Sequence, residues 1–269
     1  MSSIREVIGY DFSRLKDGQT VYICSSALPN FISEAFPTIQ KRFILITGDC
    51  DESCPNELFR SHEEFIRFIE SDKIIHWYSQ NSIGKHPKLT QIPIGLDYHT
   101  MSTRDHEWGP KTDPLEQEHL LLTIRQSAKP LAQRIVKAYA NFHFLMNTKY
   151  AYDRIDAINK IPKSSVFYEP NKVVRMDTWK TQSEYAFVIS PHGNGLDCHR
   201  TWEAIALGAI PILKTSALDM MFEGLPVWIV QDWNQVTESG MLEKIKEFQK
   251  DTTLEKMQLN YWLKKIRNM

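Results

Sequence analysis

The sequence has few cysteines, no long apolar segment and almost no net charge. Its 269 residues include 4 cysteines and carry a formal net charge of −1 at pH 7. No stretch approaches the ~18–20 consecutive apolar residues that a membrane-spanning helix needs. A near-neutral balance argues against a basic footprint for nucleic acid or a membrane surface over the whole chain. We therefore expect a protein with no membrane span and no nucleic-acid partner.

The cysteines do not form a recognisable disulfide or zinc framework. Cys50 and Cys54 are spaced for a disulfide or for half of a metal site, but no second pair follows at zinc-like spacing. Reduced thiols in a cytosolic protein are the simpler interpretation. The first residues, MSSIREVIGYDF, carry charges and lack the apolar region of a signal peptide. We therefore expect a soluble protein in the cytoplasm.

Short apolar runs alternate with turn residues and helical patterns, which is typical of an α/β fold with parallel strands. In the first half, strands are predicted near residues 42–47 and 73–78, with an amphipathic helix over 62–71 between them. Residues 103–118 are polar and are interpreted as a long exposed loop.

The length suits two domains of typical size. We predict a first Rossmann-like domain over residues 1–127 and a second over residues 128–269. The second is expected to begin with a helix over 130–140 and a strand over 141–146. Each domain should carry its functional loops at the carboxyl ends of its strands.

The most informative stretch is residues 187–211, which read FVISPHGNGLDCHRTWEAIALGAIP. It begins with a short apolar run of strand formers, and residues 190–195 then carry turn chemistry. A helical pattern is predicted from Leu196 to Gly208, and another strand begins at Ile210. The stretch is therefore one strand, glycine-rich loop, helix and strand of a parallel sheet.

Three polar residues of this helix indicate the kind of ligand. His199 and Arg200 lie in the first turns, and Glu203 lies one turn later on a neighbouring part of the surface. A helix N-terminus beside glycines attracts phosphate, and an arginine adds a charged fork. Glu203 has the wrong charge for phosphate but suits the hydroxyls of a ribose. These features together fit a ligand that contains pyrophosphate and ribose.

The segment SPHGNGLDCHRTWEAIALGAIPIL resembles the donor-binding signature of exostosin-like glycosyltransferases. The strongest similarity covers about residues 185–233. A weaker one covers LITGDCDESCP and HPKLTQIPIGLDYHT in the first half. The resemblance implies an inverting transferase of the GT-B type, in which two Rossmann-like domains face each other across a cleft and the last helix commonly returns to the first domain. It also implies transfer from a UDP-sugar to a glycan hydroxyl, with no obligatory metal or other cofactor. Animal members of this family are typically membrane-anchored, and this sequence departs from them.

The loop chemistry and the resemblance together give one set of predicted donor-binding residues. The glycine loop and Arg200 are expected at the diphosphate, with Arg154 as a second phosphate contact. His192 is expected to donate to a phosphate or sugar hydroxyl, and Lys214 to contact the base or ribose. The full set is Ser190, Pro191, His192, Gly193, Asn194, Gly195, His199, Arg200, Thr201, Glu203, Arg154 and Lys214.

An inverting transfer needs a base for the acceptor hydroxyl, and such a base in GT-B proteins usually belongs to the first domain. Asp51 is the first candidate, Asp49 the second and Asp97 a close competitor. Asp49 and Asp51 also form a D-x-D string. Two hard carboxylates suit Mg²⁺ or Mn²⁺, so a metal-dependent transferase stays open as an alternative.

A third possibility is a module that binds a nucleotide sugar or glycan without turning it over. The sequence does not name the sugar, because small differences in a pocket set such specificity. Xylose is slightly preferred on the resemblance alone. Glucuronic acid, N-acetylglucosamine, galactose and arabinose stay open.

Overall fold

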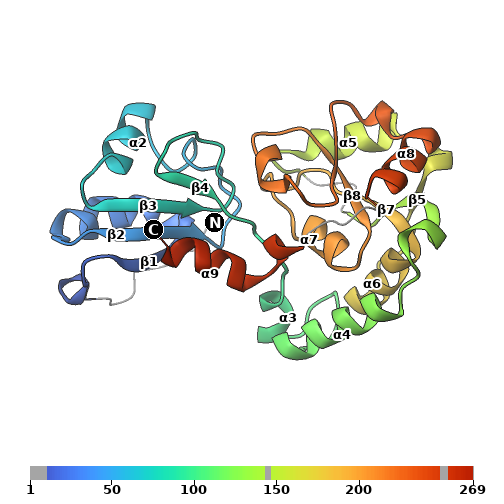
Figure 1. Ribbon diagram of the computed structural model, residues 1–269, viewed down its shortest axis with the longest axis horizontal. Helices are drawn as coiled ribbons and strands as arrows, with labels where there is room; N and C mark the ends of the chain where they lie inside the picture. Colours follow the sequence, from blue (N-terminus) through green and yellow to red (C-terminus); the bar gives the residue numbers. More distant parts are fainter. Residues whose placement is uncertain (1–10, 143–146, 249–253, 269) are drawn as a thin grey trace. The chain divides into compact units, whose positions relative to one another are not determined.

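The computed structural model describes residues 11–142, 147–248 and 254–268. The described residues form two parallel β-sheets with helices, as an α/β fold requires (Figure 1). The chain divides into two compact units. Unit 1 comprises residues 1–94, 194–197 and 259–269, and unit 2 comprises residues 95–193 and 198–258.

Unit 1 contains a four-stranded parallel sheet in the order β1-β2-β3-β4, with no reversal of strand order among its described strands. The carboxyl ends of parallel strands meet at one edge, so the loops that follow them lie together. Its elements are β1 (Gln19–Cys24), α1 (Leu28–Asn30), β2 (Phe43–Gly48), α2 (His62–Ile69), β3 (Ile74–Ser79), β4 (Leu89–Gln91) and α9 (Leu259–Arg267).

Both faces of the unit 1 sheet are covered. On one face, Phe43 and Trp77 pack with Phe31 and with Phe65 of α2. These aromatic side chains make up much of the core and are fully buried. On the other face, α9 packs its Ile266 with Ile44 and Tyr78. The helix at the end of the described chain therefore groups with the first sheet (Figure 1).

Unit 2 contains a five-stranded parallel sheet in the order β6-β5-β7-β8-β9. The chain leaves β5 toward one edge to form β6, and then returns to place β7 on the other side of β5. The elements of the unit are α3 (His99–Thr103), α4 (Pro114–Ser127), β5 (Ile135–Ala140), α5 (Ala151–Lys160), β6 (Val166–Tyr168), α6 (Arg175–Glu184), β7 (Tyr185–Ile189), α7 (His199–Ala206), β8 (Ile210–Lys214), β9 (Trp228–Val230) and α8 (Glu238–Phe248).

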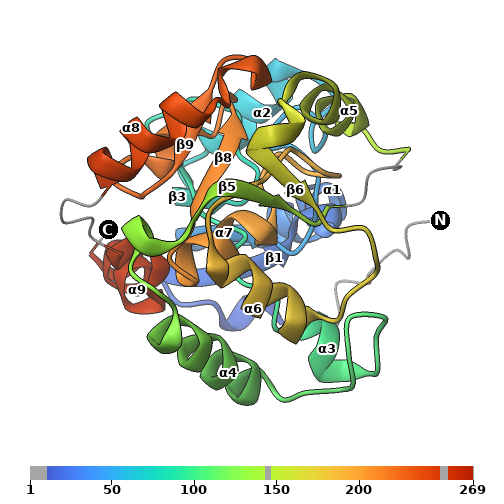
Figure 2. The same cartoon turned by 90° about the vertical axis from the view of Figure 1, so that its right-hand side faces the viewer.

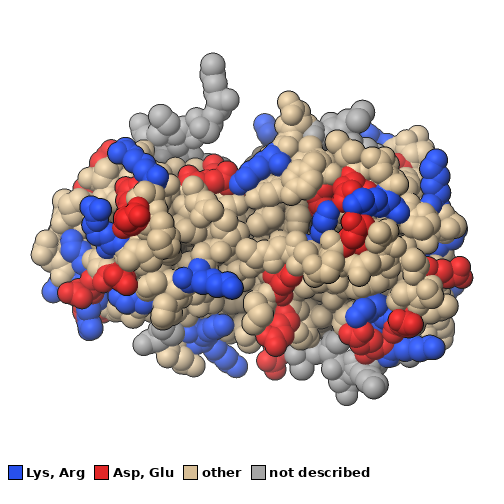
Figure 3. Space-filling model, turned by 90° about the horizontal axis from the view of Figure 1, so that it is seen from above, with Lys and Arg blue, Asp and Glu red and all other residues tan. Residues whose placement is uncertain are grey.

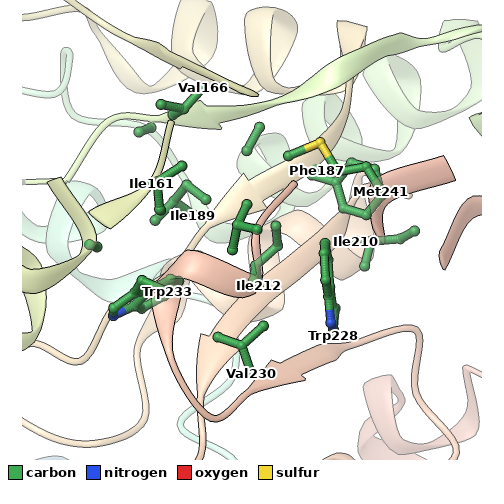
Figure 4. Packing of buried hydrophobic residues seen from close by; sticks show 14 of the residues in the cluster. Ile161, Val166, Phe187, Ile189, Ile210, Ile212, Trp228, Val230, Trp233 and Met241 are labelled. Atoms are coloured by element: carbon green, nitrogen blue, oxygen red, sulfur yellow. The ribbon is translucent and has the colours of Figure 1, made fainter. Parts of the chain in front are cut away.

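The unit 2 sheet lies between two layers of helices (Figure 2). Helices α5 and α8 cover one face, where Phe187 and Ile212 pack with Trp228 and Met241 (Figure 4). On the opposite face α6 and α7 pack against β7, and α4 lies alongside both helices. A strand buried on both faces reads as a continuous apolar run, which is why FVI in β7 was recognisable in the sequence.

Several sequence expectations differ from the structure near the start of unit 2. The helix expected over 130–140 is wrong, because residues 135–140 form β5. The strand expected over 141–146 falls partly on 143–146, which lie outside the described residues. Residues 114–127, assigned to a loop and the end of the first domain, form α4 with an Asp113 capping box. The division between units follows Ile94, whereas the sequence analysis placed it after residue 127.

Charged side chains of both signs are interspersed over the face drawn in Figure 3, and neither sign forms a continuous field there. This agrees with the formal net charge of −1. Among the described helices, not one combines the length and apolar character needed to cross a bilayer.

Candidate functional site

The strand order of unit 2 creates a switch point between β5 and β7. The connections from these two neighbouring strands run in opposite directions along the sheet. In open α/β sheets the two loops then diverge and leave a crevice at the carboxyl ends, which is where ligands bind. Residues 190–193 follow β7 at this place, and Asn141 and Phe142 follow β5.

The first part of the glycine loop is fixed by buried hydrogen bonds. Ser190 shares a bond of 2.8 Å between its Oγ and Thr201 Oγ1. The His192 backbone N–H donates to Asp153 Oδ2 at 3.0 Å, and Trp233 Nε1 donates to Asp153 Oδ1 at 2.8 Å. Asp153 is fully buried. It thus ties the loop to the corner after β9, a role that the sequence analysis missed.

Two arginines converge on the loop from different helices. Arg154 of α5 donates from Nε to His192 O at 3.1 Å, and Arg200 of α7 lies 3.4 Å from Pro191 O through Nη1. Their guanidinium carbons lie 6.0 and 5.7 Å from the ring centroid of Phe142. Arg154 Nη2 lies only 2.7 Å from where a Cβ of Gly193 would be. The glycine therefore allows the guanidinium to reach the backbone.

Burial lowers the pKa of Arg154, and the positive charge of Arg200 lowers it further. Arg154 is 5 % exposed. Two like charges held together in a partly dehydrated place repel each other; the charge of Asp153 offsets part of this effect, and an anionic ligand would offset more. The α7 N-terminus beside them carries no side-chain cap, and its partial positive charge adds to the same field. This side of the site is suited to a phosphate or diphosphate.

Glu203 lies one turn along α7 from Arg200, with a side chain that is 12 % exposed. No hydrogen-bond donor among the described residues reaches its carboxylate. Its ion-pair partner in that part of the chain is Arg175, whose Nε lies 4.0 Å from Glu203 Oε1. A largely buried carboxylate without donors is costly. Its open acceptor positions suit ligand hydroxyls.

The Tyr98 hydroxyl is a second buried polar group near Glu203. Among the described residues it has no hydrogen-bond partner. Burial raises the pKa of Tyr98 to about 12, with added repulsion from Glu118 and Glu203. Most buried hydroxyls are paired, so a hydroxyl without a hydrogen bond beside a carboxylate that no donor reaches requires an explanation. A ligand that bonds to both groups supplies one.

Asp97 lies in the same region but is already paired. Its Oδ2 accepts from Arg175 Nη2 at 2.9 Å, and its Oδ1 accepts from the Thr100 N–H at 3.0 Å and lies 3.0 Å from His99 Nδ1. Burial acts to raise the pKa of Asp97, but the bonds from Thr100 and Arg175 and the charge of Arg175 outweigh it. The pKa therefore lies below its usual value. Asp97 therefore binds Arg175 and the Thr100 backbone, a structural role that the sequence did not indicate.

The remaining predicted donor residues are spread over several environments. His199 donates from Nδ1 to Gly95 O at 2.7 Å, which fixes the start of α7. Lys214 reaches Asp156 Oδ2 at 2.7 Å, so its ammonium has a partner on α5. Asn194 and Gly195 group with unit 1 rather than unit 2.

The loop that carries Asp49 and Asp51 follows β2 at the carboxyl edge of the unit 1 sheet. The Asp49 N–H donates to Gln80 Oε1 at 2.7 Å, and Asn81 Nδ2 donates to Cys50 O at 3.2 Å. These bonds join the loops after β2 and β3, as the strand order requires. Asp49 and Asp51 are both exposed. Asp49 has a positive φ of 60°, which sharpens the turn.

The structure brings together Arg154, Arg200 and the first half of the glycine loop, with Glu203 one turn away. It adds residues that the sequence analysis missed: Phe142, Tyr98, Asp153 and Arg175. Their partners lie far away in the sequence, so no local spacing marks them. Over the described residues, no group of three or more His, Cys, Asp or Glu side chains is placed to hold a metal ion.

A search with protein-family models gives no match for this chain, and a search of curated proteins gives none either. The exostosin-like resemblance therefore rests on the motif residues themselves.

Proposed function

We propose that this protein is an inverting glycosyltransferase that moves a monosaccharide from a UDP-sugar to a hydroxyl of a glycan acceptor. Unit 2 holds the donor in this proposal. The GT-B arrangement is part of it, as is xylose as the slightly preferred sugar. No metal or other cofactor is required. The main support is the pair of guanidinium groups that contact the glycine loop beside Phe142, one helical turn from the Glu203 carboxylate, which no hydrogen-bond donor of the described residues reaches.

Each part of the donor has a matching group. Arg154 and Arg200 offset the negative charge of the diphosphate, which grows as the bond to the sugar breaks. At Gly193 the absence of a side chain lets the Arg154 guanidinium lie against the backbone, so that it can bond to a phosphate held at the glycine loop. Glu203 accepts hydrogen bonds from the two ribose hydroxyls. The diphosphate thus occupies the β5/β7 switch point, where α/β sheets bind ligands.

The reaction is a displacement at the anomeric carbon of the sugar. The acceptor oxygen forms a bond to that carbon while the bond to the diphosphate oxygen breaks, and UDP leaves with both electrons. A carboxylate takes the acceptor proton. Asp51 stays the first candidate for this base and Asp49 the second. Asp97 is the weakest of the three, because Arg175 and Thr100 already occupy its oxygens.

Calorimetric titration of UDP and uridine tests the donor site. We expect Glu203→Gln to weaken UDP binding by about tenfold or more, since a hydrogen bond to a charged group contributes roughly 1.5–3 kcal/mol. Arg200→Lys keeps the charge but loses the fork, so it should weaken UDP much more than uridine. The matched control is Glu184→Gln, at an exposed position on α6, which should bind UDP like the wild type.

The proposal fails if the wild-type protein binds no UDP, or if Glu203→Gln binds UDP as tightly as the wild type does. Turnover is tested separately with UDP-sugars and a set of glycan acceptors. Donor binding with no transfer to any acceptor would indicate a binding module. Activity that is lost with a chelator would indicate the metal-dependent alternative.

A further inference from the structure

Arg175 lies next to Glu203 and is only 8 % exposed. Aromatic rings and hydrogen-bond acceptors surround its guanidinium group. The guanidinium lies 4.8 Å from the Trp108 ring centroid and 5.7 Å from that of Trp179. The Arg175 backbone N–H also donates to Trp108 O at 2.7 Å. Two aromatic faces and a backbone bond therefore fix both the position and the plane of this charge.

The terminal nitrogens of Arg175 are used on the side away from Glu203. Nη1 donates to Asp97 O at 2.5 Å and lies 3.2 Å from Gln117 Oε1, and Nη2 donates to Asp97 Oδ2 at 2.9 Å. Nε faces Glu203 Oε1 at 4.0 Å, which is beyond hydrogen-bond distance. Asp97 and Gln117 thus prevent the fork from turning onto Glu203.

This geometry has a clear consequence for Glu203. A forked arginine–carboxylate pair would use both carboxylate oxygens. Here the Arg175 charge stays 4.0 Å from the carboxylate, while both carboxylate oxygens keep open acceptor positions. A fixed carboxylate with two open oxygens matches two neighbouring hydroxyls. A site built around such bonds discriminates strongly against an analogue that lacks one hydroxyl.

We infer that Arg175 is a positioning residue that holds Glu203 ready for the ribose hydroxyls, and that it makes the site select ribonucleotides over 2′-deoxyribonucleotides. This inference rests on the proposed function, because it takes UDP as the ligand of unit 2. Arg175 itself does not contact the nucleotide. It acts through Glu203, and Asp97 acts through Arg175.

The test compares the affinities of UDP and 2′-deoxy-UDP by calorimetry, in wild type and in Arg175→Lys. We expect the wild type to prefer UDP by about tenfold or more, the range of one hydrogen bond to a charged group. Lysine offers no planar fork, so it cannot satisfy Asp97 and face Glu203 together. The preference should then fall to about threefold or less. Arg104→Lys, at an exposed arginine after α3, is the matched control and should keep the full preference.

If Arg175 has only a structural role, Arg175→Lys should weaken the binding of both ligands equally and leave the ratio of their affinities unchanged. That result would overturn the inference, while UDP binding by the wild type would still support the donor site. Absence of UDP binding by the wild type would instead remove the proposed function itself. If Arg175→Lys does not fold, Trp108→Leu decides the question, because it removes one aromatic face from a partly exposed loop. A ratio reduced at least threefold supports the inference, and an unchanged ratio overturns it.

Discussion

The two units share an all-parallel α/β architecture but differ in strand order. The described strands of unit 1 follow one another across the sheet, whereas unit 2 reverses direction between β5 and β7. Only a reversal makes neighbouring loops diverge and leave room for a ligand at the carboxyl edge. At the unit 1 edge, the loops after β2 and β3 bond to each other, as Asp49 does to Gln80 and Asn81 does to Cys50. The two units thus differ in strand order, and among the described strands the reversal that predicts a ligand site at a carboxyl edge occurs in unit 2.

The charges at the two edges differ in the same way. In unit 2, the guanidinium groups of Arg154 and Arg200 lie close together at the glycine loop. The Glu203 carboxylate accepts no hydrogen bond from the described residues. In unit 1, the exposed Asp49 and Asp51 follow β2. An edge with largely buried charged groups is suited to binding, and exposed carboxylates are suited to proton transfer. The proposed division of labour therefore assigns the donor to unit 2 and the base to unit 1.

The largest expected effect concerns the base. We expect Asp51→Asn to lower sugar transfer by roughly 10²–10⁴-fold, the usual scale of general-base catalysis, and to leave UDP-sugar affinity nearly intact. Initial rates and calorimetric affinities of one protein sample measure both. Normal transfer by the mutant would make Asp51 a simple loop residue. Loss of donor affinity, together with a wild-type requirement for Mn²⁺, would instead support the metal-dependent alternative.

The sequence was most informative where local pattern and packing agree. The apolar run of β7 and the turn chemistry after it predicted the strand–loop–helix–strand unit, because a strand buried on both faces carries a simple signal. The helix begins at His199 rather than Leu196, since Cys198 is the residue with extended backbone before it. The pattern fixed the element but not its first turn, as is usual for helix boundaries.

Other features could not be read from the sequence because they depend on distant partners. Residues 135–140 were predicted as a helix, but pairing with β6 and β7 on both sides makes them a strand. Tertiary pairing overrides weak local propensity in such segments. Arg175 is bonded to Asp97, 78 positions away. No spacing rule connects such residues, so its relation to Glu203 is visible only in the fold.

Two neighbouring glycines offer a sharper comparison, since contacts place Gly193 in unit 2 and Gly195 in unit 1. A Cβ on Gly193 would lie 2.7 Å from Arg154 Nη2, so Gly193→Ala must displace that guanidinium. We expect UDP affinity to fall about tenfold, which corresponds to roughly 1.4 kcal/mol. Because the displaced group is the end of a flexible side chain, thermal stability should change little.

Gly195→Ala should give the opposite pattern. Its Cβ would lie 2.9 Å from Asn81 Nδ2 and 3.1 Å from Asp51 O, and a backbone oxygen cannot easily move away. We expect a loss of about 1–3 kcal/mol in the free energy of unfolding, as for other overpacked sites, with UDP affinity within about twofold of the wild type. Equal losses of UDP affinity in the two variants would break the distinction between the two halves of the loop.

The smallest expected effect concerns Lys214, whose expected contact with the nucleotide stays a prediction. Lys214 and Lys160 both pair with Asp156, at 2.7 and 2.9 Å. This allows a comparison of Lys214→Met with Lys160→Met, because each removes one cation from the same carboxylate, although Lys160 also pairs with Asp232 at 2.6 Å. If Lys214 is structural, both variants should lose less than about 1 kcal/mol of stability, since partly exposed ion pairs contribute little. Both should also bind UDP within about twofold of the wild type. A drop of tenfold or more in UDP affinity for Lys214→Met alone would show that the Lys214 ammonium leaves Asp156 for the ligand. The donor site would then extend along the carboxyl edge of unit 2 from the switch point to the end of β8.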